Sequence, residues 1–116
     1  MSSYISKVAP KTVRYSIQRL GDGKPSLTPI DHPATQAAAR AIEASFGAAP
    51  LYIMEGGSVP VCASFESILG LRTVLLGFAP PDGQFHSPNE WMSMANYETG
   101  IRAIARYWGE VAGLER

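Results

Sequence analysis

The sequence predicts an α/β fold, in which a short, mostly parallel sheet is flanked by helices and an outlying N-terminal strand lies apart from it. From residue 31 onward, segments with helical periodicity alternate with short apolar segments in the order helix, strand, helix, strand, helix. This order is typical of parallel strands joined by helical crossovers. Residues 12–20 alternate apolar and polar side chains, as in a half-buried strand, but a linker rich in glycine and proline separates them from the rest.

Three helices are predicted from apolar periodicity and from residues that favour helix ends. Asp31 can cap a helix that begins near Pro33, and Gly47 favours its end. This helix is rich in alanine on its apolar face, which predicts close packing. A second helix covers roughly residues 59–69 and stops at Gly70. The apolar face of the last helix, which reaches about residue 112, comprises Tyr97, Ile101, Ile104, Ala105, Trp108 and Val111.

Two short apolar runs between these helices predict the strands of the sheet. Residues 50–54 and 72–78 are apolar without polar alternation. Strands of this kind are buried on both faces in parallel sheets. Residues 79–94 are rich in proline and polar side chains and predict an irregular loop.

Composition excludes several classes of protein. The 116 residues carry ten basic and ten acidic side chains, so the formal net charge is zero and no basic stripe suggests a nucleic-acid partner. The single cysteine excludes a disulfide framework and favours a reducing cytoplasm. No apolar run is long enough to predict a membrane span, and the N-terminal residues lack the apolar core of a secretory signal.

The first loop with possible chemistry follows the 50–54 run and contains Gly56, Gly57 and Ser58. In open parallel sheets, ligands bind beyond the carboxyl ends of the strands. Bare amide groups and a hydroxyl at the start of the next helix could bind an anion such as a carboxylate or phosphate. The alternative is a tight turn with a serine cap. A phosphate-binding P-loop is excluded because the GK[ST] ending is missing.

The second such loop follows the 72–78 run and contains His86. A loop histidine can ligate a metal, but it can equally be a surface or capping residue. No other histidine, cysteine or carboxylate is spaced to complete a metal motif. Cys62 falls inside the second helix among apolar residues, which favours a buried structural cysteine over a nucleophile. His32 is expected to be a cap or a surface residue.

Four short motifs occur in the same order as in one known family: "DHP", "EGGSVPV", "LLGF" and "HSPNE". Together they resemble the C-terminal end of the co-catalytic zinc exopeptidases, the family of aminoacylase, carnosinase, carboxypeptidase G and succinyl-diaminopimelate desuccinylase. The carnosinase-like dipeptidases are the most similar branch. The resemblance covers about residues 13–112.

The resemblance implies roles for particular residues. His86 matches the last zinc ligand of a two-metal site, and Glu90 matches a glutamate that braces the loop. Gly56, Gly57 and Ser58 match the loop that holds the carboxylate or backbone of a small peptide substrate. The family also implies two domains: residues 1–29 would be a remnant of the lid or dimerisation domain, and residues 30–116 the C-terminal part of the catalytic domain.

Two departures from the family pattern limit these expectations. Met54 stands where dipeptidase relatives commonly have arginine, which puts the substrate preference in question. The family's other metal ligands and its general base lie upstream of the matched part, and this sequence contains none of them.

The resemblance therefore implies a fragment of a zinc-dependent dipeptidase or amidohydrolase that is inactive alone. Helix faces and sheet edges left uncovered would make it a homo-oligomer or the partner of a complementing upstream peptidase chain. The alternative is a stand-alone, non-catalytic protein that keeps the family core for assembly or weak ligand binding.

Overall fold

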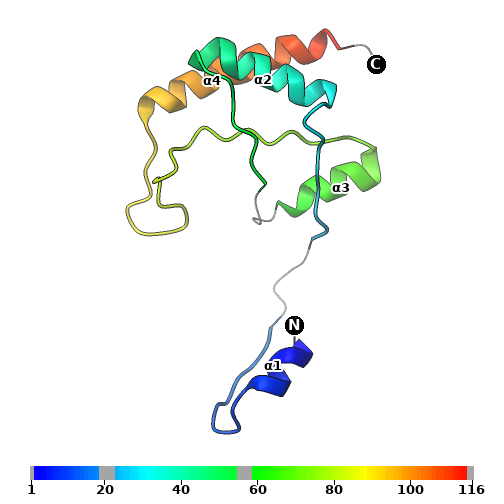
Figure 1. The fold of residues 1–116 in the computed structure, drawn as a ribbon, viewed down its shortest axis with the longest axis vertical. Coiled ribbons are helices and arrows are strands. Elements are labelled where there is room, and N and C mark those ends of the chain that lie inside the picture. The colour runs from blue at the N-terminus through cyan, green and yellow to red at the C-terminus, as the bar shows by residue number, and fades with distance from the viewer. Residues whose placement is uncertain (1, 19–22, 55–58, 115–116) are drawn as a thin grey trace.

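Four helices form the regular secondary structure of residues 2–18, 23–54 and 59–114, which are the residues that the computed structural model describes. They are α1 (Ser2–Val8), α2 (Pro33–Phe46), α3 (Pro60–Leu69) and α4 (Met94–Ala112) (Figure 1). These ranges contain no strand. The predicted α/β fold is therefore wrong for the described chain, both for the mostly parallel sheet and for the outlying N-terminal strand.

The three helices predicted from the sequence are confirmed, with small changes at their ends. The α2 helix begins at Pro33 and ends before Gly47, whose φ of 73° is left-handed. Its N-cap is His32 rather than Asp31, because the His32 Nδ1 accepts a hydrogen bond from the Ala34 amide at 3.2 Å. The α3 helix likewise ends before Gly70, with a φ of 67°. The short α1 helix was not predicted from the sequence.

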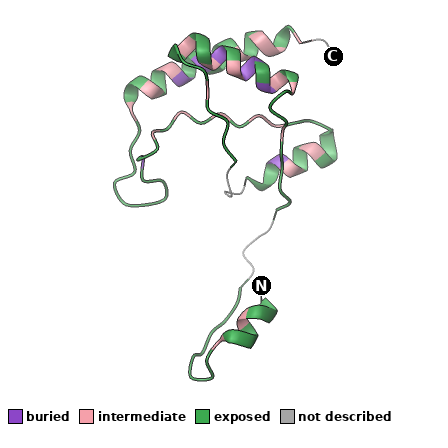
Figure 2. Ribbon diagram, in the orientation of Figure 1, coloured by how far each residue is buried: buried purple, intermediate pink, exposed green. Residues whose placement is uncertain are grey.

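The α2 and α4 helices lie side by side and form the main packing contact of the chain (Figure 1). Small side chains make this close approach possible, and Figure 2 shows the buried residues along both helices. The buried residues of the pair are Thr35, Ala37, Ala38 and Ala41 on α2 and Gly100 and Ala103 on α4. The Arg40 Nη2 also lies 2.7 Å from the Glu110 Oε2, which links the two helices at their surface.

The apolar face predicted for α4 is not the face that packs against α2. Ile101 and Trp108 are 53% and 71% exposed, and Tyr97 and Ile104 are also exposed. The buried residues of α4 are instead Gly100 and Ala103. The larger apolar side chains of α4 therefore remain uncovered.

Phe78 anchors the chain beneath the two packed helices. Its ring stacks on that of Phe46 in α2, with 5.8 Å between the ring centroids and 10° between the planes. A Cβ added at Gly100 would lie only 2.8 Å from the Phe78 Cδ2. The Asn96 Nδ2 donates a hydrogen bond to the Phe78 carbonyl at 3.2 Å. Phe78 is thus held by both helices, at the point where the next loop begins.

The two runs predicted as fully buried strands are irregular and largely exposed. Leu51 is 91% exposed in the 50–54 run, and Leu75 is 67% exposed in the 72–78 run. Among the described residues no backbone hydrogen bond joins these two runs. An apolar run shows that a segment requires burial, whereas a strand also requires a neighbour that pairs with its amides and carbonyls. That neighbour is not found within the described ranges.

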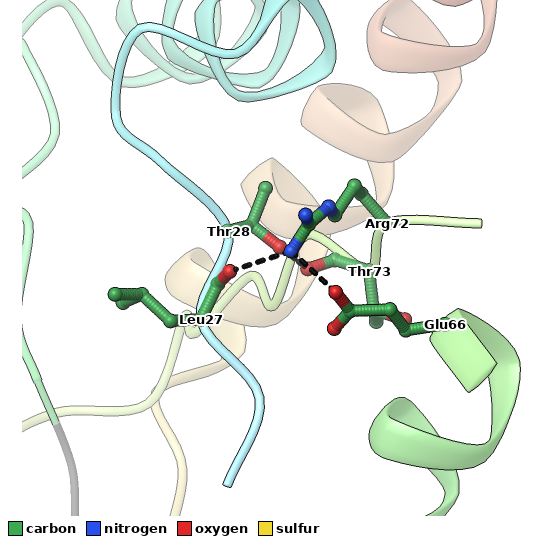
Figure 3. Close-up of polar contacts among 5 residues, drawn as sticks. All are labelled: Leu27, Thr28, Glu66, Arg72 and Thr73. Atoms are coloured by element: carbon green, nitrogen blue, oxygen red, sulfur yellow. Dashed lines mark hydrogen bonds and ion pairs between the residues drawn. The ribbon is translucent and has the colours of Figure 1, made fainter. Parts of the chain in front are cut away.

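Side-chain contacts, rather than a backbone ladder, join the 72–78 run to the segment that precedes α2 (Figure 3). The Thr28 Oγ1 donates to the Thr73 carbonyl at 2.7 Å. The Arg72 Nη1 donates to the Leu27 carbonyl at 3.2 Å and lies 2.6 Å from the Glu66 Oε1 of α3. This cluster fixes α3 against the two extended segments.

The fold is open for a chain of this size. The chain exposes 9779 Å² of surface, whereas a compact chain of 12.5 kDa exposes about 6,200 Å². The radius of gyration is 19.1 Å, against about 13 Å for a compact domain of this length. The buried apolar residues of the described chain are four alanines and Cys62. Most of its large apolar side chains therefore lack a packing partner.

Candidate functional site

The loop formed by residues 79–93, here called the His86 loop, projects from the packed helices (Figure 1). It starts immediately after Phe78, and it ends at Ser93, whose side chain caps α4 by accepting a hydrogen bond from the Asn96 amide. The Asn96 side chain reaches back to the Phe78 carbonyl. Both ends of the loop are therefore fixed to the first turn of α4.

Two hydrogen bonds from Trp91 close the base of the loop. Its indole Nε1 donates to the Asp82 carbonyl at 3.0 Å, and its backbone amide donates to the Gly83 carbonyl at 3.1 Å. Gly83 is buried at this point, and an added Cβ would lie 3.1 Å from the Pro80 carbonyl oxygen and 3.2 Å from the Trp91 carbonyl oxygen. The close approach of the two ends thus depends on a residue without a side chain.

The tip of the loop is built from turns with left-handed residues. Gln84, His86 and Asn89 have φ angles of 53°, 58° and 65°. Ser87 closes one turn, because its amide donates to the Gln84 carbonyl at 3.1 Å and its hydroxyl donates to the same oxygen at 2.6 Å. A left-handed conformation is costly for residues with a side chain and requires support from neighbouring contacts.

His86 is exposed at this tip, so its imidazole is accessible from solvent. Glu90 is also exposed, and the described residues provide no hydrogen bond or ion pair to its side chain. Its predicted bracing role stays a prediction. Among the described residues no group of three or more histidine, cysteine, aspartate or glutamate side chains could hold a metal ion. His86 thus offers one ligand, whereas zinc sites use three or four from the protein.

The predicted substrate loop cannot be compared with this geometry. Gly56, Gly57 and Ser58 lie outside the described residues. Met54, just before them, is 86% exposed. The N-cap of α3 is Val59, which makes no side-chain capping hydrogen bond.

Cys62 is buried in α3 and carries a free thiol, which confirms its prediction as a buried cysteine.

A surface hollow of about 440 Å³ lies elsewhere, between α2 and α4, where Arg40 pairs with Glu110. No residue of the His86 loop lines it. Within the described ranges, none of the helices combines the length and apolar character needed to cross a bilayer.

Sequence reasoning missed Trp91 as the residue that closes the loop. A signal was present, because Asp82-Gly83 is a turn dipeptide and predicts a reversal of the chain at that point. The partner of that reversal could not be identified from sequence spacing, since it lies eight or nine residues further on.

The chain is similar to known dipeptidases. It is 33% identical over 84 residues to the Cys-Gly metallodipeptidase dug1 of Schizosaccharomyces pombe, an alignment that covers 72% of this chain and 18% of that protein. It is 33% identical over 90 residues to the human Beta-Ala-His dipeptidase, covering 78% of this chain and 18% of that protein. A third relative, the Cys-Gly metallodipeptidase DUG1 of Candida albicans, is 29% identical over 94 residues, which are 81% of this chain and 19% of that protein.

Residues 2–110 match the family model of peptidase family M20/M25/M40. The chain belongs to this family, which confirms the resemblance to the zinc exopeptidases. It spans about a fifth of the length of the curated relatives it matches.

Proposed function

We propose that this chain supplies one metal ligand, His86, and one substrate-binding loop to a zinc-dependent dipeptidase. The observation that carries the proposal is the place of His86 in a chain of this family: it stands exposed at the tip of a loop fixed at both ends. A neutral imidazole presented in this way can ligate zinc. The metallodipeptidase relatives support a metal-dependent activity.

The other parts of the active site would come from residues beyond these 116. When bound by a complete ligand set, zinc lowers the pKa of a bound water and polarises the carbonyl of the peptide bond. A single histidine provides neither that ligand set nor a general base. The chain alone is therefore expected not to hydrolyse peptides, and it would act together with the upstream part of a family catalytic domain.

The exposed apolar surface supports a partner of this kind. The uncovered face of α4, with Ile101, Ile104 and Trp108, lies on the element that carries the end of the His86 loop. A partner that covers this face would also approach the loop. We propose that the upstream part of the catalytic domain covers this face. When that part is absent, a second copy of this chain would cover it. Residues 1–29 would belong to the lid or dimerisation domain and residues 30–116 to the catalytic domain.

The substrate would be a small peptide with a free carboxylate. Gly56, Gly57 and Ser58 would bind that carboxylate through amide and hydroxyl groups ahead of α3. Met54 provides no positive charge beside this loop, so the enzyme would not share the preference of relatives that carry arginine there. The buried free thiol of Cys62 is compatible with a reducing cytoplasm.

A zinc titration of the purified chain tests the role of His86. We expect zinc to bind through His86 and binding to be lost in His86→Ala, measured by calorimetry at high protein concentration because one imidazole binds weakly. The chain has only two histidines, so His32→Asn is a matched control. Asparagine retains the capping function at the start of α2, and zinc binding should persist.

Zinc binding that is unchanged in His86→Ala would contradict the proposal. That result would favour the alternative of a non-catalytic protein that keeps the family core for assembly or weak ligand binding. The absence of a second and third ligand among the described residues is the observation that keeps this alternative open.

A further inference from the structure

We infer that Asp82 is a modification site: its side chain can isomerise to isoaspartate through a cyclic imide with Gly83, and the closed base of the His86 loop protects it from this reaction. Asp82 is exposed, so water has access to it. Neither a metal ion nor the proposed role of His86 is required for the reaction.

The reaction needs only water and the two residues themselves. The Gly83 nitrogen attacks the Cγ of the protonated Asp82 carboxyl group, a C–N bond forms, and the hydroxyl leaves with the amide proton as water. Glycine hinders this attack least, because it has no side chain. Water then adds to one of the two imide carbonyls. Opening at one carbonyl restores aspartate, and opening at the other leaves the backbone running through Cγ.

The turn formed by residues 80–83 keeps the two reacting atoms apart. The Gly83 amide donates to the Pro80 carbonyl at 3.0 Å. Asp82 does not have a positive φ, which excludes a type II turn and identifies a type I turn. The third residue of a type I turn has a ψ of about 0°. At that angle the Gly83 nitrogen eclipses the Asp82 nitrogen rather than its Cβ, so it lies away from Cγ.

Both sides of the peptide group between Asp82 and Gly83 are hydrogen-bonded. Its N–H donates to Pro80, and its carbonyl oxygen accepts a hydrogen bond from the Trp91 indole Nε1 at 3.0 Å. Gly83 is also buried, and its own carbonyl accepts a hydrogen bond from the Trp91 amide at 3.1 Å. The rotation of ψ that brings the nitrogen to Cγ turns the whole peptide group. It must therefore break the bonds to Pro80 and to the indole together.

Opening of the loop base is thus the step that makes Asp82 reactive. Such local opening requires less free energy than unfolding of the whole chain. Isomerisation would insert one extra carbon into the backbone between the Asp82 Cα and the Gly83 nitrogen. The turn and the Trp91 bonds would then lose their register, and the modified loop would remain open at its base.

The test follows isoaspartate at Asp82 in the whole chain during long incubation at neutral pH. Trp91→Phe removes the indole bond but keeps an aromatic ring and the amide bond. Asp82 should then isomerise roughly two- to tenfold faster, as expected for the loss of one hydrogen bond. Trp108→Phe, on the exposed face of α4, is the matched variant and should react as the wild type does. Peptide mapping with an aspartate-specific endoproteinase, which does not cleave at isoaspartate, measures the rates.

The sequence provides an internal reference, because it contains a second Asp-Gly pair, Asp22–Gly23. Trp91→Phe should leave the rate at Asp22 unchanged, which separates opening of the loop base from unfolding of the chain. The wild-type chain in urea gives the unprotected rate at Asp82, and the folded chain should react more slowly.

These rates decide the inference. Slower reaction in the folded chain, together with faster reaction at Asp82 alone in Trp91→Phe, supports it. Equal rates at Asp82 in the folded chain and in urea would overturn the protection, as would an unchanged rate in Trp91→Phe or equal acceleration at Asp22 and Asp82. If no isoaspartate forms at Asp82 even in urea, Asp82 is not a modification site.

Discussion

At the scale of single residues, the fold depends on positions where a side chain is absent. Gly100 lets the ring of Phe78 approach the backbone of α4, and Gly83 lets the two ends of the His86 loop meet. Neither glycine has the positive φ that would explain it by backbone conformation. Their role is close packing, which can be tested by adding a single methyl group.

We predict that Gly100→Ala destabilises the chain. The added Cβ would lie 2.8 Å from the Phe78 ring, so the ring would have to shift away from Phe46. Overpacking of this kind costs about 1–3 kcal/mol. Gly109→Ala is the matched control on the same helix, because no atom lies within 4 Å of its added Cβ. Alanine favours helix by up to about 1 kcal/mol at either position, so this gain acts alone at Gly109 and only partly offsets the overpacking at Gly100. Urea unfolding followed by helical circular dichroism should show opposite shifts, and equal shifts would contradict this view of Gly100.

A second prediction concerns the pH dependence of the stability of the chain. Partial burial raises the pKa of Tyr107 above its usual value of 10.0, because its ionised form is poorly solvated there. Below pH 10 the hydroxyl is neutral in both the folded and unfolded chain. Above pH 10 it ionises more readily when unfolded, so the free energy of unfolding should fall as pH rises through the raised pKa.

Tyr107→Phe should remove this part of the alkaline loss of stability. Tyr97→Phe removes an exposed hydroxyl from the same helix and provides the control. Urea unfolding at a series of pH values around and above pH 10 measures the effect. If the free energy of unfolding falls equally with pH in Tyr107→Phe and in the wild type, Tyr107 does not contribute to the alkaline loss of stability.

At the scale of secondary-structure elements, helices could be predicted and strands could not. The ends of α2 and α3 follow from local signals, a proline at the first turn and a left-handed glycine at the end. A strand depends on a partner distant in sequence, and the 50–54 and 72–78 runs have no such partner among the described residues. The packing face of α4 was mispredicted for a related reason: its buried positions are the small residues Gly100 and Ala103 rather than the larger apolar side chains, and Gly100 is buried against Phe78, a residue distant in sequence.

The candidate site was also predictable only in part: its position in the chain could be predicted, but the way its loop closes could not. The sequence placed His86 in an irregular loop between the 72–78 run and the last helix, and the structure confirms that position. The sequence could not predict how the loop closes, because the indole of Trp91 reaches a backbone carbonyl whose place depends on an intervening turn. The metal-binding role of His86 stays a prediction, as does the role of Gly56, Gly57 and Ser58.

A third prediction concerns the contact between the two irregular segments in Figure 3. Thr28→Val replaces a hydroxyl with a methyl group of similar shape and removes the bond to the Thr73 carbonyl, which is 2.7 Å long and partly buried. The loss should cost about 0.5–1.5 kcal/mol. Thr12→Val, at an exposed position, makes the same chemical change away from this contact. Urea unfolding should show a lower midpoint for Thr28→Val alone. Equal midpoints would mean that the two segments are joined by other contacts.

At the scale of the whole molecule, the exposed apolar surface is the dominant feature. Large apolar side chains are exposed on α4, where Ile101, Ile104 and Trp108 form an apolar stripe, and also in the 50–54 run and at Leu75. The buried core of the described residues consists of small side chains. Contiguous apolar surface in water favours association. A partner in the family fold would cover it, and copies of this chain can cover it for one another.

We therefore predict that the purified chain self-associates through the apolar stripe of α4. Its mass by light scattering should rise above 12.5 kDa with increasing concentration. Trp108→Glu places a charge in the stripe at a residue that is 71% exposed, so it should shift the mass toward the monomer with little loss of helix. Ala95→Glu adds the same charge to α4 away from the stripe and should associate as the wild type does. A wild-type mass that stays at 12.5 kDa up to high concentration would contradict the prediction, and equal association of both variants would place the contact on another surface.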